Sequence, residues 1–233
     1  MSTEADTARR RYLQIADQLM ESIRSEGMAP GDRLPSERDL ASRFEVSRQT
    51  AREALIALEA AGVVEIRLGS GVYVQSTGNS GSAIEFEDAP GPLEILEARK
   101  IFESEAAALA AERISNEELQ KLNVLIRLMS AGSDQRQSED VEASDRKFHR
   151  VIAEASRNSA VVSMVDWLWE LRSKSEISRF FHQKAREHGS RPNIDDHQQV
   201  LQALTRHDPQ AAREAMRDHI ARVYQEFSEY ILG

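Results

Sequence analysis

Apolar residues recur at helical spacing in several stretches of the chain, and each stretch predicts an amphipathic helix that faces a core. Near the start, one helix is predicted over residues 8–25 by the positions of Tyr12, Ile15, Ala16, Leu19 and Ile23. Shorter helices are predicted over 36–44 and 47–61. Apolar runs at 63–67 and 72–75 flank a Gly-rich turn, which is typical of a hairpin. The start of the chain is therefore predicted to hold three helices and a small β-hairpin.

Beyond Pro92 the helical period continues, and no strand is predicted there. The predicted helices span residues 93–113, 116–131, 137–156, 159–182, 194–206 and 209–232. Capping patterns support two of these boundaries, since Ser115 is followed by Glu118 and Asp208 precedes Pro209. Six helices with apolar stripes predict an all-α bundle.

The composition changes between the two helical regions. Residues 76–92 read STGNSGSAIEFEDAPGP, which is rich in Gly, Ser, Pro and acidic residues and has no sustained period. We therefore predict an N-terminal domain over 1–76, a linker over 77–92 and a helical domain over 93–233. The predicted fold class is mainly α, with a small β-hairpin in the first domain.

The second short helix of the N-terminal domain has a polar face. Arg48, Gln49 and Arg52 lie off its apolar stripe, and Ser47 can cap its start. Guanidinium groups can bond guanine edges or phosphates, and Gln49 and Thr50 offer hydrogen bonds near the helix N-terminus. This face suits a recognition helix in the DNA major groove, and the alternative is a solvated helix face.

The stretch from Tyr12 to Gln75 contains several spaced submotifs, namely PGDRLPSERDLA, VSRQTAREAL, LEAAG and the G-x-G-x-x-V of the hairpin turn. In this it resembles the winged helix-turn-helix of GntR-family bacterial transcription regulators. Arg33 and Arg67 are further candidates for DNA contacts. The resemblance implies contacts from Arg38, Ser47, Arg48, Gln49, Thr50, Arg52 and Gly69.

The net charge of −9 is not typical of a nucleic-acid-binding protein. The charge is unevenly distributed, because residues 33–52 hold five arginines and only three acidic residues. We therefore expect few phosphate contacts per subunit and marked salt sensitivity. A homodimer on a palindromic operator would then supply the affinity that one subunit lacks.

The chain has no cysteine, which excludes disulfides, thiolate metal sites and cysteine nucleophiles. No stretch approaches the roughly 20 apolar residues that span a bilayer. No apolar run follows the arginines in MSTEADTARRRYLQ, so we expect no secretory signal. These features predict a cytoplasmic protein with no membrane partner.

Three histidines and an aspartate occupy core-facing positions in the helical domain. Asp145 and His149 are four residues apart on one predicted helix, and His197 and His219 lie on the apolar stripes of two others. Taken singly, each histidine fits a hydrogen-bonded core residue. Together, one carboxylate and three imidazoles suit a divalent cation such as zinc or nickel, with positions left for water or an anion.

The second half of the chain contains EARKIFESEAAALAAER, Asp145 and His149 in D-x-x-x-H, Asn158, and the later histidines in H-x-x-V-L-x-A-L and M-x-x-H-I. In these motifs it resembles the FCD ligand-binding domain of the FadR subfamily of GntR regulators. Six helices resemble the VanR-like form. The resemblance implies a metal site whose ligands are Asp145, His149, His197 and His219.

Arg99 stands where the family has an arginine near the metal. In that role its guanidinium would fork the carboxylate of an effector whose other oxygen binds the metal. The alternative is an intrahelical ion pair with Glu103, four residues on.

These features predict a DNA-binding transcription regulator, a repressor, whose operator binding is controlled by a small organic acid at the metal. One rival is a metal-dependent hydrolase with a DNA-binding appendage. The chain has no H-E-x-x-H motif and few acids near the site to act as a general base, so we do not expect an enzyme. Another rival is a regulator in which the metal is only structural.

Overall fold

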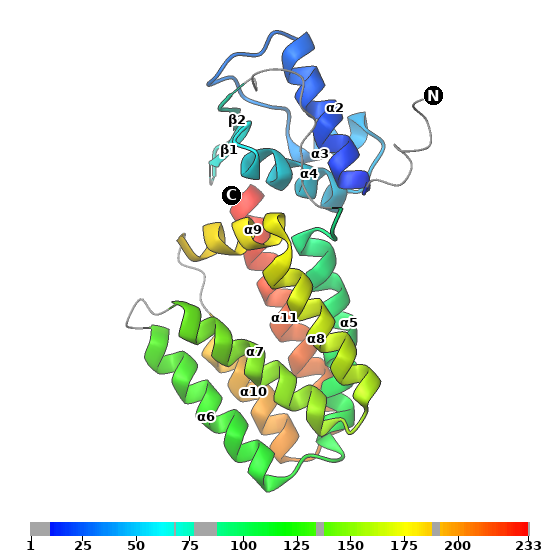
Figure 1. Ribbon diagram of the computed structural model, residues 1–233, viewed down its shortest axis with the longest axis vertical. Coiled ribbons are helices and arrows are strands. Elements are labelled where there is room, and N and C mark those ends of the chain that lie inside the picture. The colour runs from blue at the N-terminus through cyan, green and yellow to red at the C-terminus, as the bar shows by residue number, and fades with distance from the viewer. Residues whose placement is uncertain (1–9, 68, 77–87, 134–137, 188–191, 233) are drawn as a thin grey trace. The chain divides into compact units, whose positions relative to one another are not determined.

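The computed structural model describes residues 10–67, 69–76, 88–133, 138–187 and 192–232 (Figure 1). These residues are mainly helical and include a two-stranded antiparallel hairpin, so the predicted fold class is confirmed. The chain forms two compact units. The first comprises Met1–Glu94, Arg172–Glu187 and Glu226–Gly233, and the second comprises Ile95–Leu171 and His188–Gln225.

The first unit begins with three helices, α2 (Arg11–Ser25), α3 (Glu37–Arg43) and α4 (Arg48–Ala60). Serine side chains fix where the last two begin. Ser36 Oγ accepts a hydrogen bond from the backbone N–H of Asp39 at 3.3 Å, and Ser47 Oγ accepts one from the N–H of Thr50 at 3.0 Å. These caps hold α3 and α4 as the two helices of a helix-turn-helix.

The hairpin follows α4 directly. Strand β1 (Val64–Arg67) pairs antiparallel with β2 (Gly71–Val74), and the register places Val64 opposite Val74. The inward side chains of the two strands join the apolar faces of the helices. The resulting core includes the fully buried Leu13, Ile23, Leu40, Leu55, Ile56 and Val64.

A helix from the second half of the sequence also belongs to the first unit. Helix α9 (Glu176–Glu187) packs against α4, and it buries Ile177 and Phe181. Helix α4 therefore packs against α9 as well as against α2 and α3.

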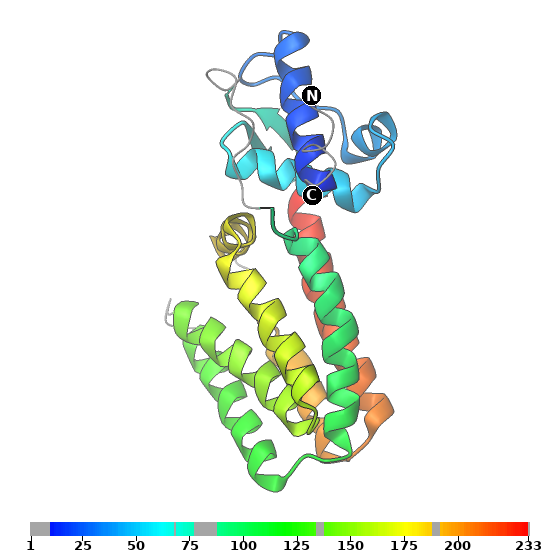
Figure 2. The same cartoon turned by 45° about the vertical axis from the view of Figure 1, so that its right-hand side comes forward.

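The second unit is a bundle. Its helices are α5 (Pro92–Ala111), α6 (Asn116–Ser133), α7 (Ser138–Ala155), α8 (Ser159–Lys174), α10 (Ile194–Thr205) and α11 (Pro209–Leu232), of which α5, α8 and α11 each have one end in the first unit. Helices α6 and α7 lie side by side, as both views show (Figures 1 and 2). The predicted capping box at the start of α6 is present, because Ser115 N donates to Glu118 Oε2 at 2.9 Å and Glu118 N donates to Ser115 Oγ at 3.3 Å.

The helix predicted over 159–182 is wrong, since two helices, α8 and α9, occupy this stretch. Ser175 lies between them and caps α9, with its Oγ accepting from the N–H of Ser178 at 3.4 Å. The described part of the second half therefore holds seven helices instead of six. Among the described residues, none of the helices is long and apolar enough to cross a membrane.

Candidate functional site

The four predicted metal ligands come together in the second unit. Helix α7 supplies Asp145 and His149, α10 supplies His197, and α11 supplies His219. One possible ligand atom from each residue lies within 4.8 Å of the others. The three histidines are buried, with at most 4% of each residue exposed.

Each histidine directs Nδ1 to an acceptor outside the cluster. His197 Nδ1 donates to the backbone oxygen of Asn193 at 2.7 Å. His149 Nδ1 contacts the carboxylate of Glu103, and His219 Nδ1 lies 3.7 Å from Asp196 Oδ2. Such outer partners fix the ring orientation of metal-binding histidines and direct the other nitrogen, Nε2, to the cluster.

Two arginines support the outer carboxylates. Arg99 Nε donates to Glu103 Oε1 at 2.6 Å, and the Arg99 guanidinium lies 4.0 Å from the ring centre of Trp169. Arg222 Nε is 2.8 Å from Asp196 Oδ2. Two of the three histidines are therefore held by a carboxylate that is itself paired with an arginine.

Electrostatics favour ionised carboxylates in this cluster. Burial alone would raise the pKa of Glu103, but Arg99 and His149 outweigh it and lower this pKa to about 2. Burial also opposes ionisation of Asp145, yet its interactions with His149 and His197 hold its pKa well below the ordinary value.

The buried imidazoles shift in opposite directions. Burial lowers the pKa of His219 to about 4 against the opposing effect of Asp196, so the ring is neutral at pH 7. Burial would also lower the pKa of His149, but the nearby Glu103 charge outweighs it and the pKa is raised. The cluster thus holds one histidine that favours the neutral form and one that attracts a proton.

The donor set fits a divalent cation. His197 Nδ1 donates to the Asn193 carbonyl, and its Nε2 lies 3.0 Å from Asp145 Oδ1, within hydrogen-bond distance. His149 Nε2 is buried without a hydrogen bond and lies 3.5 Å from the same oxygen. Ring nitrogens and a carboxylate oxygen at these distances can share a proton, and a metal ion can take the place of that proton when the imidazoles are neutral. Three imidazoles and one carboxylate are typical zinc ligands.

Arg99 adopts the alternative arrangement considered from the sequence, the intrahelical pair with Glu103. It is buried, with 4% of the residue exposed. The pair uses Nε and Nη2, and Nη1 makes no hydrogen bond within the described part of the chain. Arg99 therefore supports Glu103 and keeps one donor group.

The predicted DNA-contacting residues lie in the first unit on α3, on α4 and at the hairpin turn. Arg38 and Arg48 are exposed, and Gln49 and Thr50 are half-buried at the start of α4. Ser47 caps α4, and its hydroxyl lies 2.8 Å from that of Thr50. The side chains of Arg38 and Arg48 are thus exposed to solvent, whereas Ser47 also stabilises the start of α4.

Arg52 differs from the expectation of an exposed polar face. It is only 7% exposed, and its Nε donates to Glu37 Oε2 at 2.6 Å. The sequence did not indicate this burial, because α3 and α4 enclose a side chain that lies off the apolar stripe. The pair uses Nε alone, and the Nη groups make no hydrogen bond within the described residues.

The hairpin turn has the geometry of a wing tip. Gly69 is exposed with φ of 69°, a conformation that favours glycine. The Arg33 guanidinium lies against Gly71, where a Cβ would come within 2.8 Å of Arg33 Nε. Arg67 is paired with Glu65 at 2.7 Å and stacks on Tyr73. Gly69 is therefore an exposed turn residue with no side chain to cover its backbone.

Sequence analysis did not identify Asp196 and Arg222, which support His219. The only signal for Asp196 was its place beside His197. Neighbours on a helix differ by about 100° in direction, so sequence alone cannot show that Asp196 reaches α11.

Comparisons with known proteins agree on both halves of the chain. Residues 94–222 match the model of the FCD domain, and residues 11–74 match that of bacterial regulatory proteins of the gntR family. The chain is 34% identical over 235 residues to the Uxu operon transcriptional regulator of Escherichia coli K12, covering 97% of this chain and 90% of that protein.

Two further relatives are regulators. The Exu regulon transcriptional regulator of Escherichia coli K12 is 36% identical over 93% of this chain and 84% of its own length. The transcriptional repressor NanR of Enterobacter sp. is 32% identical over 90% of this chain and 82% of its own length. A solved GntR-family structure from Pseudomonas syringae pv. tomato shares the fold, with a TM-score of 0.51, 23% identity and coverage of 94% of this chain and 85% of that one.

Proposed function

Because the chain belongs to the GntR family of bacterial regulatory proteins and is a DNA-binding transcription regulator with an FCD domain, we propose that it is a repressor controlled by a small organic acid. The acid would bind at a divalent metal ion, zinc or nickel. The ligands would be Asp145, His149, His197 and His219. The relatives are transcription regulators, so the chain is not an enzyme.

The observation that supports this proposal is the convergence of three buried imidazoles and one carboxylate from three helices. His197 Nε2 and His149 Nε2 both face Asp145 Oδ1, at 3.0 and 3.5 Å, inside a buried cluster whose outer carboxylates are paired with arginines. A bound divalent ion would supply positive charge for an anionic ligand.

The residues around the ligands would set how an acid is held. Arg99 is fixed by Glu103 and stacks on Trp169, which leaves Nη1 as a donor of defined direction. We propose that this group bonds a carboxylate oxygen of the effector, in addition to supporting Glu103.

In the DNA-binding part, the proposed contacts come from an exposed set and from one buried arginine. Arg48 and Arg38 would contact bases or phosphates, and Gly69 would approach a phosphate through its backbone. Arg52, held through Nε by Glu37, would present its Nη groups. The proposed set also includes Ser47, Gln49 and Thr50.

A homodimer on a palindromic operator would place two recognition helices in successive turns of the major groove. The proposed division of labour assigns DNA binding to residues 1–76, a linker to 77–92, and effector binding and dimerisation to 93–233.

The first test is the metal content of the purified protein, measured by mass spectrometry. We expect about one zinc or nickel ion per subunit in the wild type, as such a site holds a single ion, and no bound metal in His197→Ala. His207→Asn is the control, because His207 donates to the Ala111 carbonyl away from the cluster and its φ of 51° suits asparagine. Metal retained by His197→Ala, or lost equally from the control, would contradict the assignment.

The second test separates control by an acid from a purely structural metal. A panel of small carboxylates is added to the metal-loaded protein bound to a DNA duplex selected by the protein from a random pool. Release of the duplex by an acid, absent in Arg99→Lys, supports the proposal. Unchanged DNA affinity across the panel would favour the structural role.

A further inference from the structure

Helix α5 begins without a local cap. Its first residue is Pro92, which has no N–H, and the preceding residue is Gly91, which has no side chain to accept a hydrogen bond. The first-turn N–H groups, including that of Glu94, therefore need an acceptor from elsewhere.

That acceptor comes from the proposed recognition helix. Glu53 on α4 accepts a hydrogen bond at Oε1 from the N–H of Glu94, at 2.8 Å, across 41 positions of sequence. Glu53 is only 4% exposed, and a Cβ on Gly91 would overlap its carboxyl group. A carboxylate at a helix N-terminus also interacts favourably with the helix dipole. Gly91 thus leaves the space that Glu53 fills.

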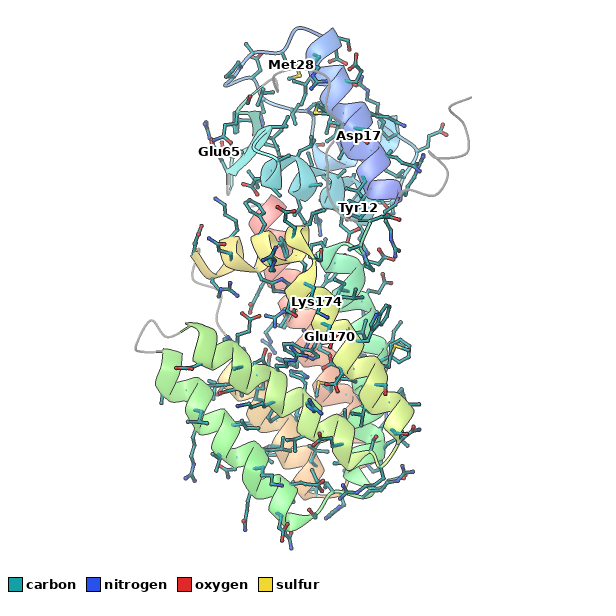
Figure 3. The ribbon with its side chains drawn as sticks, in the orientation of Figure 1. Tyr12, Asp17, Met28, Glu65, Glu170 and Lys174 are labelled. Carbon is teal, nitrogen blue, oxygen red and sulfur yellow. The ribbon has the colours of Figure 1, made fainter. Side chains whose placement is uncertain are left out.

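The residues just before α5 are held by the same unit. The hydroxyl of Tyr12 on α2, labelled in Figure 3, donates to the Ala89 carbonyl at 2.9 Å. The N–H of Arg10 donates to Asp88 Oδ1 at 2.9 Å, and the Arg10 side chain lies 3.5 Å from Glu94. The start of α5 is therefore fastened to α2 and α4 within the first unit.

The same helix carries support for the candidate metal centre. Arg99 and Glu103 lie one and two turns beyond the first turn of α5, and Glu103 contacts His149. At about 1.5 Å of rise per residue, nine residues of α5 separate Glu94 and Glu103 by roughly 14 Å along the helix. On α4, Glu53 directly follows Arg52.

We propose that Glu53 is a positioning residue that couples the metal centre to DNA binding through the N-terminus of α5. A change in the contact between His149 and Glu103 would shift the position of α5. The hydrogen bond from the Glu94 N–H to the Glu53 carboxylate would then shift α4. The inference rests on the proposed function, since it needs a metal centre that controls DNA binding.

The test measures linkage between zinc and DNA in the full-length chain. Dissociation constants are determined for a duplex selected by the wild-type protein, with stripped and zinc-loaded protein, and for zinc with and without the duplex. Reciprocal coupling must appear in both sets, and we expect a factor of roughly 5 to 150 in the wild type. In Glu53→Gln we expect less than about a twofold coupling, with zinc affinity of the DNA-free protein unchanged.

Two further variants make the test specific. Glu59→Gln is the matched control, because Glu59 on α4 also accepts from a backbone N–H, that of Ile66 at 3.1 Å, but within the hairpin region. It should keep the wild-type coupling. In Gly91→Ala, Glu53 is unchanged, but the added methyl group overlaps its carboxylate and displaces it. This variant should also lose the coupling, and it tests the inference even if Glu53→Gln does not fold.

Hydrogen exchange of the first-turn amides of α5 reports the cap itself. Exchange of the Glu94 amide should rise roughly two- to fivefold in Glu53→Gln, the range for loss of a charge at a helix N-terminus, and should not change in Glu59→Gln. Wild-type coupling in both Glu53→Gln and Gly91→Ala would overturn the inference alone. Absence of coupling between zinc and DNA in the wild type would also overturn the inference, whereas the proposed control by an acid is decided separately by the carboxylate panel.

Discussion

Removing the Arg52 side chain should destabilise the helix-turn-helix as well as weaken DNA binding. The side chains of Arg52 and Glu37 are only 8% and 4% exposed, and they are joined at 2.6 Å. Arg52→Ala would leave the Glu37 carboxylate buried without its partner. Breaking a buried pair in this way costs about 3–5 kcal/mol. Glu37 lies in the first turn of α3, where the helix dipole favours a carboxylate, so we expect a loss near the lower end, about 3 kcal/mol.

The contrast with Arg48 separates folding from recognition. Arg48 is exposed, so Arg48→Ala should change stability by less than about 0.5 kcal/mol while DNA affinity falls strongly. The double variant Glu37→Gln with Arg52→Met removes both buried charges and should recover most of the stability lost in Arg52→Ala.

Native-state hydrogen exchange in increasing urea measures this effect where it occurs, because the amides of α3 and α4 report the opening free energy of their own region. DNA affinity is measured in parallel by fluorescence anisotropy. A loss of less than about 1 kcal/mol in Arg52→Ala would refute the reasoning, since a solvent-screened pair is expected to contribute only that much.

Three other outcomes follow from the metal centre. Glu103→Gln should weaken zinc binding by about 10- to 100-fold in a chelator competition, because Glu103 contacts His149. Glu97→Gln, on the exposed side of α5, is the control and should leave zinc affinity unchanged. Equal losses of zinc affinity in the two variants would contradict the role of Glu103. Because the raised pKa of His149 keeps its proton to higher pH, zinc affinity should increase as pH rises through that pKa, and a flat profile in wild type would exclude His149 as a ligand. Zinc at 100 times its dissociation constant should add about 2.7 kcal/mol of stability in wild type and none in His197→Ala, as thermal unfolding would show.

Local signals were sufficient for much of the fold. Ser36, Ser47 and Ser115 cap helices as their sequence neighbours predicted, because a cap is decided within four residues. The sequence did not predict the end of α8 before Ser175, because the apolar period continues through this position. The two helices are distinguished by packing, since α9 packs against α4.

The residues of the candidate site were also predicted only in part from the sequence. Periodicity and family resemblance pointed to His149, His197 and His219, because each must face a core. They could not show that Arg52 is enclosed or that Asp196 reaches His219, since both depend on how separate helices pack. The periodicity within one helix does not show which side chains of different helices form pairs.

The arginine-supported carboxylates also set the charge balance of the cluster. Arg99 offsets the charge of Glu103, and Arg222 offsets that of Asp196, so Asp145 is the acidic ligand without an arginine partner among the described residues. A divalent ion with Asp145 and three neutral histidines would leave a net charge of about +1 in a buried space. One singly charged carboxylate neutralises that charge, whereas a second anionic group would remain unbalanced and costly to bury. With the proposed metal ion bound, the surroundings of the site would thus favour ligands with a single acidic group at the metal.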